Sequence, residues 1–366
     1  MKNMLTRTAL ASSVLLLSVS AASAQTTVSG NLDLVYKAVS SDKAAARSYR
    51  YFGKESQINL GNKGKLNNGM DYAAGFSLEF DGSDANAAGA SLTTSLNVLE
   101  GAFSENVFID FISGNTTITF GADHIQNPDK AVTNLVGIMD PDDAASGVTT
   151  ASAGNAATAP AFNTTHNSAY QAYGVGVIQT IPSVGKLSLN YTPDRNTGRA
   201  NSDTTGVNTT SNVQYQYDAG QSAYEIGFIG DFGVKGLEVQ AFYNNSEKET
   251  AAQTSDLKGR MYAIKYNMGQ TTVAAQRGET TSLASVDKTS DSFAIAYAIS
   301  PNLSAGLTYA KTKQDAATVD EKITQVSVGY NLGPVLAGIS YATIDNTALV
   351  SGDDGKTLAL KLSTKF

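Results

Sequence analysis

The sequence predicts an all-β fold: a 16-stranded antiparallel transmembrane β-barrel. Three observations predict it, namely an export signal at the N-terminus, a period-two alternation of apolar with small or polar residues, and a regular alternation of long and short connections. The composition agrees, because 42% of the residues are hydrophobic and only 16% are charged, with 33 Gly and 17 Tyr. Soluble domains usually carry more charge on their surfaces.

The N-terminal segment has the features of a secretory signal. Two basic residues precede an apolar run over residues 9–19, and Ala22-Ser23-Ala24 supplies the small residues that a signal peptidase accepts. The run is shorter than the ~20 apolar residues of a spanning helix. We therefore expect residues 1–24 to be a cleaved signal peptide and residues 25–366 to form the mature barrel. No later apolar run is long enough for a helix to cross a membrane, so a crossing must use strands.

Alternating segments of about ten residues recur along the mature chain, as in membrane barrel strands. Tyr or Phe stands near many of the strand ends, as the interfacial aromatic girdles of barrels require. The alternation predicts sixteen strands, at 27–37, 50–60, 70–80, 104–112, 115–123, 169–181, 185–192, 223–231, 236–244, 258–268, 270–278, 290–299, 302–311, 322–331, 334–344 and 357–366.

The connections test the strand assignment independently. A barrel with both termini in the periplasm alternates long external loops with short periplasmic turns. Connections after even-numbered strands are short and contain Gly or Pro, except the first, 61–69, which is longer. Connections after odd-numbered strands are long and polar, and the third of these loops covers residues 124–168.

A secreted β-sandwich or a β-solenoid also alternates. In a sandwich, however, the second face of each strand meets solvent and is usually charged, whereas here that face is largely Gly, Ser, Thr, Ala, Asn and Gln. The barrel is therefore the better interpretation. A closed barrel of sixteen strands encloses a water-filled lumen, which points to passage of solutes.

Composition and motifs exclude several other functions. The chain has no Cys and two His, which argues against zinc, iron–sulfur and His-based metal sites, and its net charge of −7 disfavours a nucleic-acid partner. No Gly-x-Ser-x-Gly motif accompanies the two imidazoles, His124 and His166, so we expect no enzyme and no cofactor. The acidic runs at 81–84, 140–143 and 353–354 could hold a structural Ca²⁺ or could be hydrated loops.

Three stretches resemble the Gram-negative trimeric porins. Residues 56–79 are similar to the family's second strand, glycine-rich first turn and third strand, and residues 118–128 are similar to its fifth strand leading into the third loop. The chain also ends on Phe366, a terminal aromatic of the kind that outer-membrane assembly machinery reads. The family commonly has Arg directly after the glycine that closes the fifth strand, where this chain has Ala122.

The resemblance implies a homotrimeric, water-filled diffusion channel of the outer membrane, with the third loop folded into the pore. Its partners would then be further copies of itself, outer-membrane lipid and lipopolysaccharide, and small hydrophilic solutes and ions. A mainly structural or adhesion barrel, a substrate-specific channel and a monomeric barrel remain as alternatives.

Acidic residues outnumber basic ones on the expected lumen face and in the third loop. A narrow acidic throat concentrates cations and repels anions, so we expect mild cation selectivity. The expected acidic constriction residues are Asp110, Asp123, Asp129, Asp140, Asp142 and Asp143. The expected basic wall residues are Lys37, opposite the loop acids, together with Lys265 and Lys361.

Overall fold

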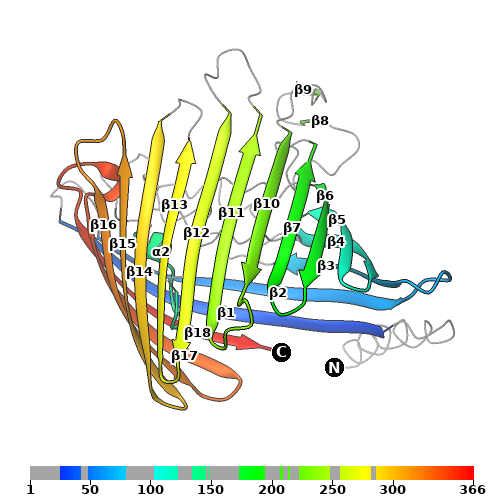
Figure 1. The fold of residues 1–366 in the computed structure, drawn as a ribbon. Helices are drawn as coiled ribbons and strands as arrows, with labels where there is room; N and C mark the ends of the chain where they lie inside the picture. The colour runs from blue at the N-terminus through cyan, green and yellow to red at the C-terminus, as the bar shows by residue number, and fades with distance from the viewer. Residues whose placement is uncertain are drawn as a thin grey trace.

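The computed structural model describes residues 25–42, 48–79, 103–122, 134–145, 148, 173–193, 207–208, 213–214, 222–247, 256–281 and 286–366. Sixteen of its strands close into one antiparallel barrel, which confirms the predicted fold (Figure 1). They are β1 (Gln25–Ser41), β2 (Tyr49–Lys65), β3 (Asp71–Glu79), β4 (Phe103–Ser113), β5 (Thr116–Ala122), β6 (Gly174–Ile181), β7 (Gly185–Thr192), β10 (Ala223–Gly230), β11 (Leu237–Ser246), β12 (Leu257–Met268), β13 (Thr271–Thr281), β14 (Asp287–Ser300), β15 (Leu303–Gln314), β16 (Glu321–Asn331), β17 (Val335–Asp345) and β18 (Gly355–Lys365).

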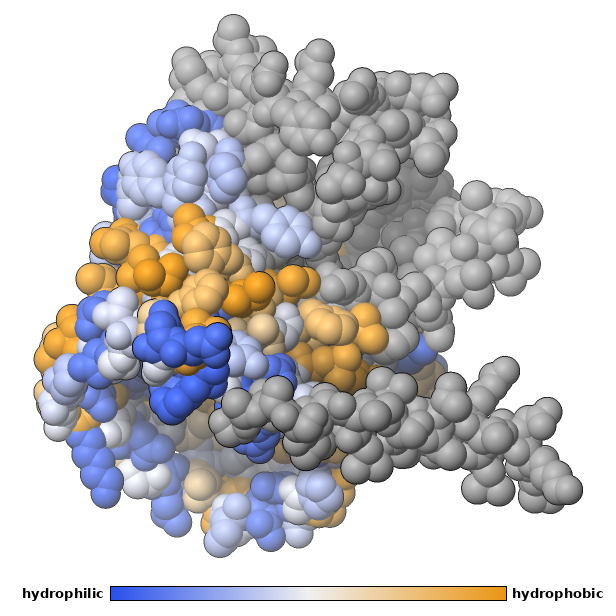
Figure 2. All heavy atoms as spheres, turned by 90° about the vertical axis from the view of Figure 1, so that its right-hand side faces the viewer, coloured by the Kyte–Doolittle hydropathy of each residue, from blue (hydrophilic) through white to orange (hydrophobic). Residues whose placement is uncertain are grey.

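The two faces of the barrel wall differ in side-chain size and polarity. Apolar side chains on one face of each strand are exposed, for example Leu34, Ile264 and Leu360. Figure 2 shows hydrophobic residues gathered in a band across the face in view, with hydrophilic residues above and below. The opposite face is buried and carries Ala, Ser, Thr, Gln and Gly. A wall that is apolar outside and small or polar inside suits a barrel with lipid around it and water within. No described helix is long and apolar enough to span a membrane.

The barrel closes where β1 pairs with β18, and Asn31 is the register partner of Lys365. Beyond that pair, Gly30 and Phe366 exchange both backbone hydrogen bonds, at 2.8 and 3.0 Å. A Cβ atom at Gly30 would lie 2.6 Å from Cζ of the Phe366 ring, so only glycine fits beneath this ring. The last residue of the chain is therefore part of the closing seam.

One predicted turn is wrong. The sequence predicts a long connection over 61–69, but β2 continues to Lys65 and the turn is short, with the Leu66 N–H donating to the Met70 carbonyl at 2.8 Å. The apolar alternation stops at Leu60, whereas backbone pairing with β3 goes on, and an ion pair of 2.7 Å joins Lys65 to Asp71 at its end. The strand therefore extends beyond the alternation of lipid-facing apolar residues from which it is predicted.

Small elements decorate the barrel. A short helix, α2 (Pro141–Ala145), lies in the third loop. A two-stranded ribbon of β8 (Val207–Asn208) and β9 (Val213–Gln214) lies in the connection between β7 and β10, and a 3₁₀ turn, η4 (Thr347–Leu349), lies between β17 and β18. The alternation rule does not predict any of these, because none crosses the membrane.

Candidate pore constriction

The third loop packs against the inner wall of the barrel. Its described residues, 134–145 and 148, meet the inward-facing side chains of β15 to β18 and β1. This buried cluster is the largest apolar core among the described residues, and it consists of Val39, Ile138, Met139, Ala144, Ala145, Val148, Ala310, Ile323, Ala342, Ile344 and Ala359. The loop thus occupies part of the lumen, as the resemblance implies, and narrows it on one side.

Glycines in the wall make room for the loop. Gly338 on β17 lies so close to Ile138 that a Cβ atom there would overlap the isoleucine side chain. A Cβ atom at Gly355 would lie 2.5 Å from Val148, and one at Gly306 would lie 2.6 Å from Val136. The missing side chains form a recess for apolar loop residues, and we call these three glycines the glycine seat.

Three side chains of the wall also fasten the loop through its backbone. The amide of Gln325 donates to the Met139 carbonyl at 2.9 Å, and the Thr357 hydroxyl donates to the Ala144 carbonyl at 2.7 Å. Lys37 donates to the Asp143 carbonyl at 2.5 Å. Because all three wall residues are buried, these bonds form away from bulk water, where losing a partner is costly.

Three loop acids form one cluster. Carboxylate oxygens of Asp140, Asp142 and Asp143 lie within 4.8 Å of one another, around the first turn of α2. Asp143 is exposed, while the other two are half-buried. Because three like charges lie so close together, this cluster is the most concentrated negative patch among the described residues of the loop. Oxygen ligands of this kind suit Ca²⁺, although six to eight are usually needed.

The sequence predicts Lys37 on the wall opposite these acids, but the structure places it beside them. Its side chain is only 5% exposed and reaches the loop itself. The third loop packs against β1 and the neighbouring strands. Lys37 therefore lies beneath the loop and does not face it across the lumen.

The other predicted site residues are distributed around the barrel. Asp110 on β4 is buried and accepts a hydrogen bond of 2.7 Å from Thr119, away from the loop-bearing wall. Lys265 pairs with Glu238 and Lys361 pairs with Asp33, each at 2.7 Å. These basic wall residues are thus neutralised locally. Asp123 and Asp129 lie outside the described residues.

Sequence reasoning missed the residues that position the loop. Glycine at inward-facing positions was visible as a pattern, but nothing in the sequence links Gly338 to Ile138, or Thr357 to Ala144, which are 213 positions apart. A second missed group is Glu321, which is fully buried and accepts a 2.7 Å hydrogen bond from the Ala348 N–H of η4. Glu321 begins its strand, where alternation gives little guidance.

Comparison of the sequence with models of protein families identifies the family of this chain. Residues 9–349 match the model described as Gram-negative porin. The chain belongs to the Gram-negative porin family. No curated protein sequence matches it. The matched range covers every barrel strand except the last, so family and fold agree.

Solved porins have the same fold at low sequence identity. An anion-selective porin from Comamonas acidovorans is 12% identical, with a TM-score of 0.60 over 94% of this chain and 100% of that one. Salmonella typhi OmpF, in a complex with daunomycin, is 13% identical, with a TM-score of 0.59 over 93% and 97%. A triple mutant of the Rhodopseudomonas blastica porin is 14% identical, with a TM-score of 0.56 over 93% and 100%.

Proposed function

We propose that this porin is a passive channel for small hydrophilic solutes and ions with a mild preference for cations. Family and barrel make it an outer-membrane diffusion channel. The observation that carries the finer proposal is the third loop, which leans into the lumen and holds three clustered carboxylates there. Passage needs no chemistry, and we propose that it needs no cofactor.

Selectivity would arise from size and charge together. The loop reduces the cross-section, so large solutes are excluded. The acids Asp140, Asp142 and Asp143 cluster on the loop that enters the lumen, and the low-dielectric barrel walls would focus their field in the narrowed passage. Elsewhere on the wall, ion pairs such as Asp33 with Lys361 balance the charges. The acid cluster therefore supports cation preference, although a porin with a similar fold is anion-selective.

Assembly and export complete the proposal. We propose that residues 1–24 are removed on export, that Phe366 is read by the assembly machinery, and that three copies form a homotrimer embedded in outer-membrane lipid and lipopolysaccharide. Membership of the porin family supports these steps. An SDS-resistant band of three times the monomer mass in unheated samples, converting to monomer on heating, tests the trimer. Migration at monomer mass without heating would contradict it.

Bilayer recording tests the channel. Purified, unheated protein in a planar bilayer should show stepwise conductance, and in a tenfold KCl gradient the reversal potential should have the cationic sign. An anionic sign would keep the channel and reject the role of the acid cluster. Absence of conductance from correctly inserted protein would favour a structural or adhesion barrel.

Neutralising the acid cluster should abolish the cation preference. In the triple variant Asp140→Asn, Asp142→Asn and Asp143→Asn, size and hydrogen-bonding groups stay while three charges leave, so the reversal potential should move toward zero. Asp71→Asn is the matched control, because Asp71 is exposed at the turn end and pairs with Lys65. An unchanged reversal potential in the triple variant would assign selectivity to other residues.

Phe366→Ala should separate assembly from stability. The seam keeps its two backbone hydrogen bonds with Gly30, and the ring is 70% exposed, so protein refolded in detergent should lose no more than about 1 kcal/mol. The amount of folded barrel in the outer membrane of cells should fall sharply. Equal folded amounts of variant and wild type in cells would reject the assembly role.

A further inference from the structure

A small gap on the inner wall is enclosed by oxygen atoms. It lies beside Gly174, the first residue of β6, where no side chain fills the space next to β7. An atom at the position of the missing Cβ would lie 2.7 Å from the Tyr191 carbonyl oxygen, 3.0 Å from Asn190 Oδ1 and 3.2 Å from Thr192 Oγ1. Of the glycines whose surroundings the structure describes, Gly174 is the only one whose three nearest atoms are all oxygens.

Two of these three oxygens have no hydrogen-bond partner within the described part of the chain. They are Asn190 Oδ1 and Thr192 Oγ1. Both side chains are more than nine-tenths buried, since Asn190 is 6% exposed and Thr192 is 1% exposed. A buried polar atom without a partner costs free energy, so an occupant of the gap that contacts both oxygens at once would stabilise the wall.

A buried carboxylate lies next to the gap. Glu225 on β10 is 2% exposed, and its two oxygens accept hydrogen bonds of 3.2 Å from the side-chain amides of Asn190 and Asn244. This arrangement suits an ionised carboxylate, which accepts hydrogen bonds through both oxygens. Because the amide nitrogen of Asn190 points to Glu225, its Oδ1 points to the gap beside Gly174. Oxygen ligands beside a negative charge favour a positively charged occupant.

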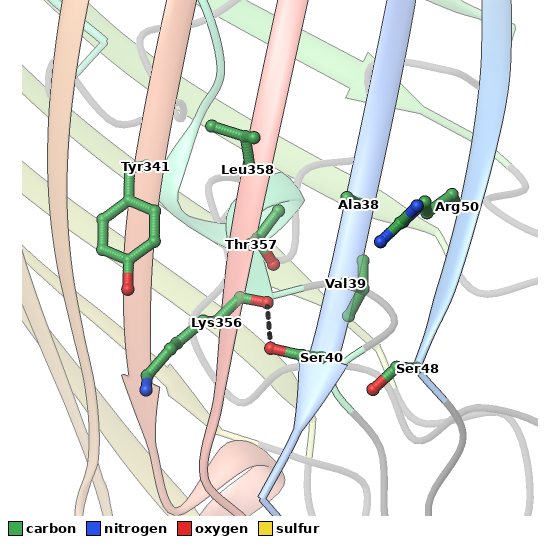
Figure 3. A pocket seen from close by; sticks show the side chains of 9 residues that line it. All are labelled: Ala38, Val39, Ser40, Ser48, Arg50, Tyr341, Lys356, Thr357 and Leu358. Atoms are coloured by element: carbon green, nitrogen blue, oxygen red, sulfur yellow. Dashed lines mark hydrogen bonds between the residues drawn. The ribbon is translucent and has the colours of Figure 1, made fainter.

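The larger pocket near β1 and β18 offers no comparable set of oxygens. Its volume is about 550 Å³, far more than one ion needs (Figure 3). The Ser40 hydroxyl donates to the Lys356 carbonyl at 3.5 Å, and the Thr357 hydroxyl donates to the Ala144 carbonyl at 2.7 Å. Both of these hydroxyl groups therefore have partners, unlike that of Thr192 within the described residues.

We propose that the gap beside Gly174 holds a resident monovalent cation of the size of K⁺, bound by Asn190 Oδ1, Thr192 Oγ1 and the Tyr191 carbonyl. Ca²⁺ binds oxygens at about 2.3–2.6 Å and Mg²⁺ at about 2.0–2.1 Å, both shorter than the distances here. Carbonyl oxygens are the ligands that K⁺ channels use. The inference goes beyond the proposed function, because this ion is held in the wall. It is also separate from the loop acids, since β10 and β18 lie on opposite sides of the ring of sixteen strands.

Two measurements on the purified protein test the site. Crystals grown in RbCl should show an anomalous peak beside Gly174, because Rb⁺ substitutes for K⁺ and scatters anomalously where water does not. In nonionic detergent, wild type should unfold about 2–4 °C higher in KCl than in LiCl of equal ionic strength, since an ion that binds only the folded barrel stabilises it. Thr192→Val keeps the shape, removes one oxygen and should lose both signals. Thr312→Val is the matched control, because Thr312 is 0% exposed and bonds to Ser290 on another part of the wall.

The control should keep the difference between KCl and LiCl even if it is less stable in both salts. Three outcomes would overturn the proposal: density beside Gly174 without an anomalous signal, which indicates water; equal unfolding temperatures of wild type in the two salts; or a salt difference that survives in Thr192→Val. Conductance is recorded on the same preparations. A wild type that conducts normally but binds no ion rejects this inference alone and leaves the proposed function standing.

Discussion

Gly338→Phe is expected to reduce single-channel conductance. The Cβ position already overlaps Ile138, so an aromatic ring at this place must push the third loop off the wall and into the lumen. Overpacking of a closely packed site costs about 1–3 kcal/mol. The three hydrogen bonds from Gln325, Thr357 and Lys37 cannot all keep their lengths when the loop shifts. Planar-bilayer recording measures the effect directly.

Ala337→Phe is the matched control for this experiment. It adds the same ring to the same strand, but one residue away and therefore on the lipid face, where bulk meets acyl chains. Its conductance should equal that of wild type. If Gly338→Phe also conducts normally, the loop does not depend on the glycine seat and the constriction lies elsewhere.

Glu321→Leu is expected to have the largest effect on stability. The Glu321 carboxylate is fully buried, accepts the Ala348 N–H at 2.7 Å and attracts the ammonium of Lys288. Removing it leaves the Ala348 N–H without its carboxylate acceptor, and a hydrogen bond to a charged group contributes about 1.5–3 kcal/mol. Ala348 and Leu349 have φ of 56° and 64°, a strained backbone that needs such support.

The temperature at which the folded barrel loses its SDS-resistant migration reports this loss, and proteolysis between residues 345 and 355 reports loosening of the loop. Glu321→Gln keeps an acceptor oxygen and should fall between wild type and Glu321→Leu. Glu279→Gln is the exposed control, because Glu279 lies 3.7 Å from Arg260 on the surface and should matter by less than about 1 kcal/mol. Equal melting of all four proteins would contradict the role of Glu321.

The strands were predictable because each has one face toward lipid and the other toward the water-filled lumen. A lipid-facing apolar residue must alternate with an inward one, so all sixteen strands are visible in the sequence, and their order follows from connection length. Strand ends were not predictable, since residues such as Gly61 to Lys65 continue the backbone pairing with β3 without apolar alternation. Hydrogen bonding between backbones leaves no mark in the side-chain pattern.

The clustering of the three loop acids was predictable, and their place at the constriction stays a prediction. Clustered Asp140, Asp142 and Asp143 are near in sequence, and the helical turn of α2 keeps them near in space. The position of Lys37 was predicted wrongly, because which wall the loop leans on depends on contacts between residues far apart along the chain. Those contacts depend on how the shapes of the loop and the wall match, and such a match leaves no periodic pattern in the sequence.

The glycine seat makes the fit between the third loop and the barrel wall specific to these two sequences. A third loop taken from another porin would bring side chains of other sizes to Gly306, Gly338 and Gly355, and it would either leave holes or fail to sit. Swapping pore loops to change selectivity therefore requires exchanging the recess as well. The position of the third loop therefore depends jointly on two distant stretches of sequence, the loop itself and the wall strands that carry the three glycines.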